Sequence, residues 1–272
     1  MRILICLNAD IVSNLALNLL LPSLAAHEVS VGLSTRIGAA GVGPGASEPA
    51  ARRELRVAEQ RFASDVLFPI IDRANLPDRS RCLTFAEIER HRGIGVRELL
   101  NPNSGAGLAF VQAFEPDVIV SIRYGAIFKT PAISVPRLGV INLHAGLLPA
   151  YRGVIATFRA LMAGESEIGC TLHYIVDGTI DTGPIVAQSR TAVDASRSLF
   201  WHVLSLYPAG VRLIADALER LDRGEPLGGR VQSGGAYFTY PTSEEWEEFR
   251  ARGWRVADPS DLYELSSRYL TA

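Results

Sequence analysis

The amino-acid sequence predicts an α/β fold in which a mostly parallel sheet is flanked by helices. Short apolar or alternating segments, typical of strands, take turns along the chain with segments in which apolar residues recur at helical spacing. Some of the strand-like segments have no polar face, as expected for strands buried on both sides of a parallel sheet. The 272 residues, 48% hydrophobic and 21% charged, suffice for one large domain or for a main domain with an appendage.

The chain opens as strand, helix, strand. Residues 2–6 (RILIC) form a short apolar run, and residues 28–34 (EVSVGLS) alternate between apolar and polar. Between them, leucines recur at helical spacing as far as Leu21. Ser13 is a suitable N-cap for this helix, and Pro22 is expected to end or kink it.

Residues 37–49 (IGAAGVGPGASEP) are rich in glycine and proline. They follow a strand and precede a helix, so a phosphate-binding loop is one interpretation. The glycines do not fit the spacing GxGxxG, and Pro44 has no amide N–H to offer a phosphate. An ordinary loop is the better interpretation.

The remaining elements continue the alternation. The patterns predict a helix over 51–73 broken near Pro69, a helix, glycine turn and strand edge over 83–99, a helix from Ser104 to Phe114, strands at 117–122 and 138–144, a helix from Ala156 to Met162, strands at 170–176 and 183–189, and a long amphipathic helix at 198–224 ended by Gly224. Thr242 and Glu245 form a capping box for a short helix. Asp258 and Pro259 open a last one.

This organisation divides the chain into a main domain, residues 1–190, and a mainly helical C-terminal extension, residues 191–272. The net charge of −2 gives no signature of binding to nucleic acid or to an acidic membrane. The three cysteines form no CxxC pair, and no leader or membrane span is evident, so we expect a cytoplasmic protein without disulfides. The apolar residues of the extension leave a homo-oligomer open.

Polar side chains follow the strands of the predicted sheet. Asn142 and His144 are two residues apart at the end of strand 138–144, so their side chains share a face. Asp181 follows strand 170–176. Because ligands bind at the carboxyl ends of strands in such sheets, we expect these three residues, the trio, to meet there. An amide that donates to an oxyanion, an imidazole near neutrality and a carboxylate that orients it or accepts a proton suit acyl transfer to an amine.

Less specific interpretations stand beside this one. A lone histidine at a strand end is usually structural, but His144 has Asn142 and Asp181 in context. The chain offers no compact ligand spacing for zinc, so we expect no metal site. His173 is either an acceptor contact or a packed residue, and Arg152 either binds an anionic acceptor group or pairs at the surface.

The segments NLHAGLLPAYRG and GCTLHYIVDGTIDTGPIVAQ resemble the formyltetrahydrofolate-dependent formyltransferase family. The resemblance covers residues 115–190 well and the opening strands loosely, and it implies a Rossmann-like sheet in a catalytic domain over residues 1–190. It implies that Asn142, His144 and Asp181 are catalytic. Gly146 and Ala156 depart from the family, where serine and proline are common, and Arg123 has no clear counterpart.

The resemblance also implies 10-formyltetrahydrofolate as co-substrate and direct attack by an amine through a tetrahedral intermediate. Two segments match the family's cofactor-binding loops: Tyr124, Gly125, Ala126, Ile127 and Phe128 at the pterin pocket, and Val176, Asp177, Gly178, Thr179 and Ile180 on the loop that closes over the folate. Asp177 is also a plausible turn former.

The acceptor is expected to be a small-molecule amine or hydroxylamine, because the chain has neither the basic surface nor the C-terminal barrel of enzymes that formylate initiator tRNA. IRYGAIF and RGVIATFRA resemble hydroxyornithine formyltransferases, which favours N5-hydroxyornithine in siderophore biosynthesis. A sugar-nucleotide amine is the alternative acceptor. A catalytically inactive folate-binding protein is the alternative of another class.

Overall fold

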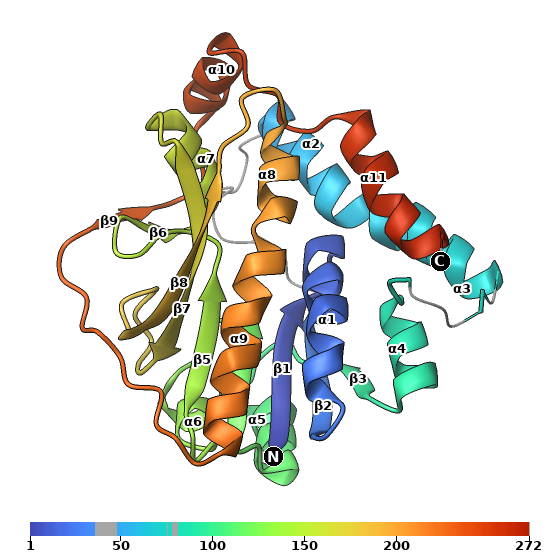
Figure 1. The fold of residues 1–272 in the computed structure, drawn as a ribbon, viewed down its shortest axis with the longest axis vertical. Helices are drawn as coiled ribbons and strands as arrows, with labels where there is room; N and C mark the ends of the chain where they lie inside the picture. The colour runs from blue at the N-terminus through green and yellow to red at the C-terminus, as the bar shows by residue number, and fades with distance from the viewer. Residues whose placement is uncertain (36–47, 75, 78–80, 272) are drawn as a thin grey trace.

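The computed structural model describes residues 1–35, 48–74, 76–77 and 81–271, and a seven-stranded sheet forms its centre (Figure 1). The strand order is β3-β2-β1-β4-β5-β7-β8. The strands are β1 (Arg2–Asn8), β2 (Glu28–Ser34), β3 (Gly95–Glu98), β4 (Val118–Ile122), β5 (Val140–His144), β7 (Glu167–Ile175) and β8 (Ile185–Ala192). The first five run parallel, whereas β7 and β8 are antiparallel to their neighbours. The predicted mostly parallel sheet is confirmed.

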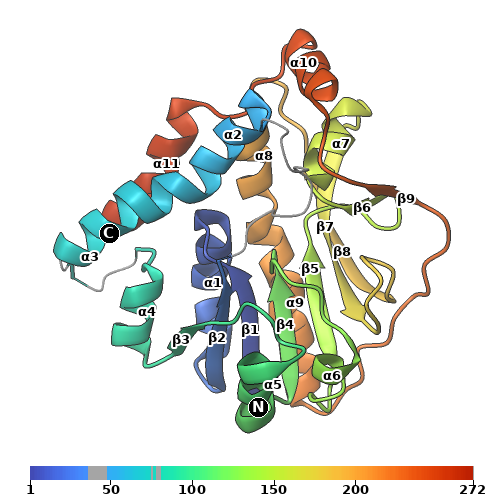
Figure 2. The ribbon, with the colours of Figure 1, turned by 180° about the vertical axis from the view of Figure 1, so that it is seen from behind.

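Helices cover both faces of the sheet. Figure 1 shows α1 and α9 across one face, and Figure 2 shows α5 and α6 on the other. The helices are α1 (Ile11–Leu24), α2 (Ala50–Arg56), the π-helical turns η1 (Val57–Arg61) and η2 (Ala63–Leu67), α3 (Phe68–Ala74), α4 (Phe85–Arg92), α5 (Gly105–Phe114), α6 (Thr130–Ile133), α7 (Ala156–Met162), α8 (Leu199–Ser205), α9 (Tyr207–Asp222), α10 (Ser243–Ala251) and α11 (Pro259–Leu270). Two short strands, β6 (Tyr151–Gly153) and β9 (Ala236–Phe238), pair with each other away from the main sheet.

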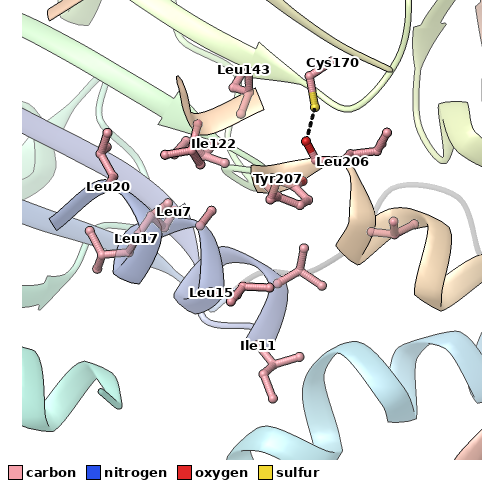
Figure 3. Packing of buried hydrophobic residues seen from close by; sticks show 14 of the residues in the cluster. Leu7, Ile11, Leu15, Leu17, Leu20, Ile122, Leu143, Cys170, Leu206 and Tyr207 are labelled. Carbon is pink, nitrogen blue, oxygen red and sulfur yellow. Dashed lines mark hydrogen bonds between the residues drawn. The ribbon is translucent and has the colours of Figure 1, made fainter. Parts of the chain in front are cut away.

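The main hydrophobic core lies between the sheet and the helices α1 and α9. Figure 3 shows Leu7 of β1 and Leu143 of β5, which come from the sheet, and Leu15 of α1 and Tyr207 of α9, which come from the helices. A second, smaller cluster fills the opposite face beneath α5 and α6. Because successive side chains of a strand point to opposite faces, both clusters draw on the same central strands, which explains their continuous apolar runs.

Two expectations for the first helix are wrong in detail. Asp10, not Ser13, is the N-cap: its backbone is extended, and its carboxylate accepts a hydrogen bond of 2.7 Å from the Ser13 N–H. Ser13 already lies inside the first turn. The helix continues past Pro22 to Leu24, because a proline in the last turn removes only one N–H donor.

Two other prolines also act differently from the prediction. Pro69 does not break its helix but lies in the first turn of α3, directly after η2, where a missing N–H costs little. The expected single helix at 198–224 is divided at Leu206 into α8 and α9. Pro208 explains the division, since it has no N–H to donate to the carbonyl of Leu204.

The capping signals read from the sequence are confirmed. Thr242 and Glu245 form a capping box at α10, and Asp258 caps α11 with Pro259 in its first turn. Gly224 ends α9 with a left-handed φ of 76°. The glycines of the 37–49 segment (Gly38, Gly41, Gly43 and Gly45) lie outside the described residues.

The helices after residue 190 belong to the same folded unit as the sheet. The expected boundary at 190 falls inside β8, and α9 packs on the sheet. Phe249 of α10 has its ring 4.9 Å from that of Phe158 in α7. Tyr269 of α11 donates a hydrogen bond of 2.7 Å to Asn14 of α1. The C-terminal residues are mainly helical, as expected, but they complete the core instead of standing beside it.

No helix within the described ranges is both long and apolar enough to cross a membrane.

Because the C-terminal helices share the core of the sheet, we expect them to unfold together with the rest of the chain. Phe249 is fully buried, so we expect Phe249→Ala to lower the free energy of unfolding by about 3–5 kcal/mol. Unfolding by denaturant, followed by tryptophan fluorescence and by circular dichroism, should show one shared transition. Tyr263→Ala is the control, because Tyr263 is 79% exposed and its loss should cost within about 0.5 kcal/mol. Two separate transitions would contradict the prediction.

Candidate functional site

The site begins where β5 leaves the sheet. The side chains of Val140, Ile141 and Leu143 are buried in the core. Asn142 and His144 are two residues apart, so their side chains project from the same face of the strand. The turn that follows is tied to β7: the Thr171 hydroxyl donates to the Gly146 carbonyl at 2.7 Å and accepts from the Leu148 N–H at 3.0 Å. These bonds fix the direction in which the chain departs from His144.

Both ring nitrogens of His144 have defined neighbours. Nε2 lies 2.6 Å from the Tyr151 carbonyl oxygen, and Nδ1 lies 3.4 Å from Oδ2 of Asp181. Because a carbonyl oxygen only accepts hydrogen bonds, Nε2 is protonated and donates a hydrogen bond to the Tyr151 carbonyl. Nδ1 is therefore the nitrogen that faces the carboxylate.

The departure from the family at residue 146 has a spatial cause. A Cβ at Gly146 would lie 2.6 Å from Nε2 of His144 and 2.6 Å from the Cβ of Ala156. No side chain fits there unless the imidazole or the backbone moves. Glycine at position 146 therefore leaves the space that the His144 ring occupies.

Asp181 reaches His144 by a route that a parallel strand would not give. β7 is antiparallel to β5, so the chain leaves β7 beside Val140, at the far end of β5. It then turns back, and the Pro184 carbonyl accepts from the Tyr174 N–H at 3.0 Å. The expectation that Asp181 follows the carboxyl end of a parallel strand is wrong, although the structure does bring the trio together. The returning loop places Asp181 in a left-handed conformation with φ 56°.

His173 lies behind Asn142 and Asp181 and is only 1% exposed. Its Nδ1 is 2.9 Å from the Tyr174 carbonyl, and its Nε2 is 3.0 Å from Nδ2 of Asn142 and 3.5 Å from Oδ1 of Asp181. In the neutral ring Nδ1 donates to the carbonyl, so Nε2 accepts from the Asn142 amide. Of its two expected roles, a packed residue that supports the trio describes this position better than an acceptor contact.

The charge of Asp181 is stabilised in spite of burial. Burial alone raises the pKa of this carboxyl, but the nearby His144, the contact with His173 and the Gly153 N–H, which donates to Oδ2 at 2.8 Å, together outweigh it. The net result lowers the pKa of Asp181 from 3.8 to about 2. The carboxylate is ionised throughout the neutral range and is a weak base.

The two predicted cofactor-binding segments lie next to each other. A Cβ at Gly178 would be 3.8 Å from the Phe128 carbonyl oxygen. Three apolar side chains of these segments are exposed: Ile127 by 50%, Val176 by 56% and Ile180 by 37%. Exposed apolar surface beside a polar constellation suits a flat aromatic ligand such as a pterin.

Other members of these segments are structural. Tyr124 donates a hydrogen bond of 2.5 Å to the Leu99 carbonyl, and its ring packs 5.3 Å from that of Phe128. Asp177 accepts a hydrogen bond of 2.8 Å from the Thr179 N–H, which agrees with the turn expected for it. Gly125 and Ala126 occupy the bend between Tyr124 and Ile127.

Arg152 reaches the Gly235 carbonyl at 3.4 Å, and its Nε is buried without a partner among the described residues. Over the same residues, no group of three or more His, Cys, Asp or Glu side chains could hold a metal ion. A groove of about 690 Å³ lies between α1, α4 and α11, and none of the predicted site residues lines it.

Sequence reasoning missed a charged network at the ends of β1 and β4. Arg123, in a left-handed conformation, has Nε 3.2 Å from Asp10 and a terminal nitrogen 2.8 Å from Glu59. Burial raises the pKa of Glu59 although Arg123 opposes it. The sequence shows that Arg123 and Asp10 follow strand-like runs, and strand ends are where such groups gather. It does not show the pairing, which joins residues far apart in the chain.

The shifted carboxyl makes stability depend on pH. Since the folded pKa of Asp181 lies below its usual value, its contribution is present above pH ~4 and is lost as the pH falls toward 2. We expect wild type to lose about 2 kcal/mol more than Asp181→Asn over that interval. Unfolding curves at stepped pH measure this. Asp216→Asn, at an exposed position, should follow wild type, and parallel curves for wild type and Asp181→Asn would contradict the assignment.

Part of the chain matches a known family and curated relatives. Residues 101–200 match the formyl transferase family. Among curated relatives, methionyl-tRNA formyltransferase from Kosmotoga olearia is 34% identical over 139 residues, 51% of this chain and 44% of the relative. That of Parvibaculum lavamentivorans is 38% identical over 168 residues, 61% of this chain and 53% of the relative. The chain thus spans about half the length of the curated relatives it matches.

Solved structures share the fold at low sequence identity. Glycinamide ribonucleotide transformylase 1 from Symbiobacterium toebii has a TM-score of 0.56 at 18% identity and covers 86% of this chain and 94% of its own. A sugar N-formyltransferase from Shewanella sp FDAARGOS_354 has 0.54 at 16%, covering 98% and 87%. An N-formyltransferase from Helicobacter canadensis, in complex with folinic acid and dTDP-3-aminofucose, has 0.51 at 17%, covering 87% and 70%. The family match over residues 101–200 and the shared fold agree with the resemblance that the two motifs show.

Proposed function

We propose that this protein transfers a formyl group from 10-formyltetrahydrofolate to a nitrogen of a small-molecule amine or hydroxylamine. The observation that carries the proposal is the convergence of Asn142, His144 and Asp181, with Nδ1 of His144 3.4 Å from the Asp181 carboxylate. His173 joins Asn142 to the same carboxylate. An amide donor, an imidazole and an ionised carboxylate in one place suit the transfer of an acyl group.

The co-substrate, when bound, supplies the formyl carbon. The adjoining segments Tyr124–Phe128 and Val176–Ile180 would hold its pterin, since they present Ile127, Val176 and Ile180 as exposed apolar surface. The folinic acid bound by the structural neighbour from Helicobacter canadensis supports a folate ligand.

Asn142 is oriented for oxyanion stabilisation. One of its two amide hydrogens is taken by Nε2 of His173, which fixes the plane of the amide. The other N–H is then free to donate to the formyl oxygen as negative charge develops there. A donor fixed in advance stabilises such charge more than mobile water does.

His144 and Asp181 would act on protons and charge. The nitrogen of the acceptor forms a bond to the formyl carbon, the bond from that carbon to the folate nitrogen breaks, and the acceptor's proton must move to the departing nitrogen. His144 Nδ1 is the group placed to carry that proton. Asp181, as a weak base, holds the ring and stabilises its positive charge instead of taking the proton itself.

For the acceptor, we propose N5-hydroxyornithine of siderophore biosynthesis as the first candidate. Its support is the similarity of residues 122–128 and 152–160 to hydroxyornithine formyltransferases. The net charge of −2 favours a small acceptor over tRNA, which demands many phosphate contacts. A sugar-nucleotide amine is the second candidate, and the names of the curated relatives make methionyl-tRNA the necessary comparison.

Replacing His144 tests the mechanism. His144→Ala should lower kcat by roughly 100-fold or more, the usual loss for a group that transfers protons, while the circular dichroism spectrum stays unchanged. His91→Ala is the matched control, since His91 lies exposed in the last turn of α4. A near-normal rate for His144→Ala would remove this residue from the chemistry.

A panel of acceptors tests the substrate. With 10-formyltetrahydrofolate as donor, we expect N5-hydroxyornithine to give at least about tenfold higher kcat/KM than amino-sugar nucleotides or methionyl-tRNA, the difference that loss of about 1.4 kcal/mol of binding in the transition state produces. Faster formylation of an amino-sugar nucleotide or of the tRNA would replace the proposed acceptor. Binding of the folate without turnover on any amine would favour the inactive folate-binding protein.

A further inference from the structure

The segment between α9 and α10 runs back across the molecule to the site. Figure 1 shows it leaving the base of α9 and rising outside β7 and β8 to β9. Arg230 exchanges two backbone hydrogen bonds with Ile185, at 2.9 and 2.8 Å. β9 then pairs with β6, placing Ala236 beside Tyr151. The segment therefore contacts both stretches of chain that surround the His144–Asp181 pair.

Gln232 is the side chain of this segment that forms hydrogen bonds with the Asp181 loop. Its Nε2 donates to the carbonyl of Asp181 at 3.1 Å and to the carbonyl of Gly183 at 2.6 Å. Both hydrogens of one amide are thus used on two carbonyls of the same turn. Within the described part of the chain, Oε1 of Gln232 is buried without a hydrogen-bond partner, so the two bonds from Nε2 hold this amide in place.

These hydrogen bonds stabilise a loop whose backbone is strained at Asp181. Asp181 is a non-glycine residue at φ 56°, a conformation that persists only where surrounding contacts impose it. The close approach at Gly183, where a Cβ would lie 1.7 Å from the Tyr174 carbonyl oxygen, shows how tightly the loop returns along β7. Release of the two carbonyls would let the loop relax toward an ordinary conformation.

The same segment supports the other members of the constellation through β6. The Gly153 N–H, which donates to Asp181 Oδ2, belongs to the strand that β9 holds, and so does the Tyr151 carbonyl that accepts from His144. The Phe238 carbonyl accepts from the Val154 N–H at 3.0 Å. One length of chain therefore fixes the carboxylate from its backbone side and the imidazole from its Nε2 side.

We propose that Gln232 is a positioning residue that keeps the Asp181 carboxylate between His144 and His173. This inference rests on the proposed function of the trio. Gln232 acts through the loop, since its two hydrogen bonds go to the carbonyls of Asp181 and Gly183. Its loss should therefore slow the chemical step while the binding of acceptor and folate changes little.

The test compares Gln232→Leu, which keeps a similar volume but has no donor, with Val231→Ala as control, because Val231 is 79% exposed on the same segment. We expect Gln232→Leu to lower kcat about tenfold with KM for the acceptor within about twofold, and the control to match wild type. A purely structural role would lower Tm and leave kcat of the folded protein unchanged. That outcome would overturn the proposal.

A measurement without turnover separates this proposal from the proposed function. The ring signals of His144 and His173 in carbon–proton NMR spectra, assigned with His144→Gln and His173→Gln, should move in Gln232→Leu and stay in Val231→Ala. Unmoved signals in Gln232→Leu would contradict positioning even if the protein transfers formyl groups. Moved signals in a protein that formylates no amine would uphold positioning and reject the function.

Discussion

The buried charge of Asp181 sets the conditions that the rest of the site must meet. Burying a charged carboxylate is energetically unfavourable unless hydrogen bonds and nearby charges stabilise it. Here Oδ2 accepts a hydrogen bond from the Gly153 N–H and lies 3.4 Å from Nδ1 of His144. These contacts lower its pKa to about 2 and keep it charged. The left-handed backbone of Asp181 is tolerable because the contacts that it makes possible outweigh its strain.

The reversal of β7 makes these contacts possible. Asn142 of β5 lies opposite His173 of β7 in an antiparallel register. Directly opposed residues in such a pair bring their side chains within reach of each other, so an amide and an imidazole meet across two strands. Because β7 is antiparallel, it ends beside Val140, and the loop that follows must turn back along the strand to bring Asp181 to this pair. The pairing of Asn142 with His173 and the return of this loop together gather the trio.

The sequence predicts what is local and misses what is distant. Helix ends with explicit caps, such as Thr242 and Asp258, and buried strands such as 118–122 follow from short-range rules. Asn142, His144 and Asp181 were found through spacing and family resemblance. Short-range sequence patterns do not reveal contacts between residues that are dozens of positions apart. The ion pairs of Arg123 with Asp10 and Glu59 and the hydrogen bonds of Gln232 are such contacts. The direction of β7 is likewise not visible in its own sequence.

The expected division at residue 190 fails for the same reason. A domain boundary belongs where few contacts cross, yet the bonds that hold Asp181 and β6 come from residues 232–238. Trp246 and Phe249, on α10, pack against Phe158 in the helix that follows β6. The C-terminal residues therefore act on the trio from two sides, through the backbone near Asp181 and through the core beneath α7. The Asp181 loop, β6, β9 and the helices α7 and α10 therefore belong to one folded unit, whose contacts hold the Asp181 carboxylate beside the His144 ring.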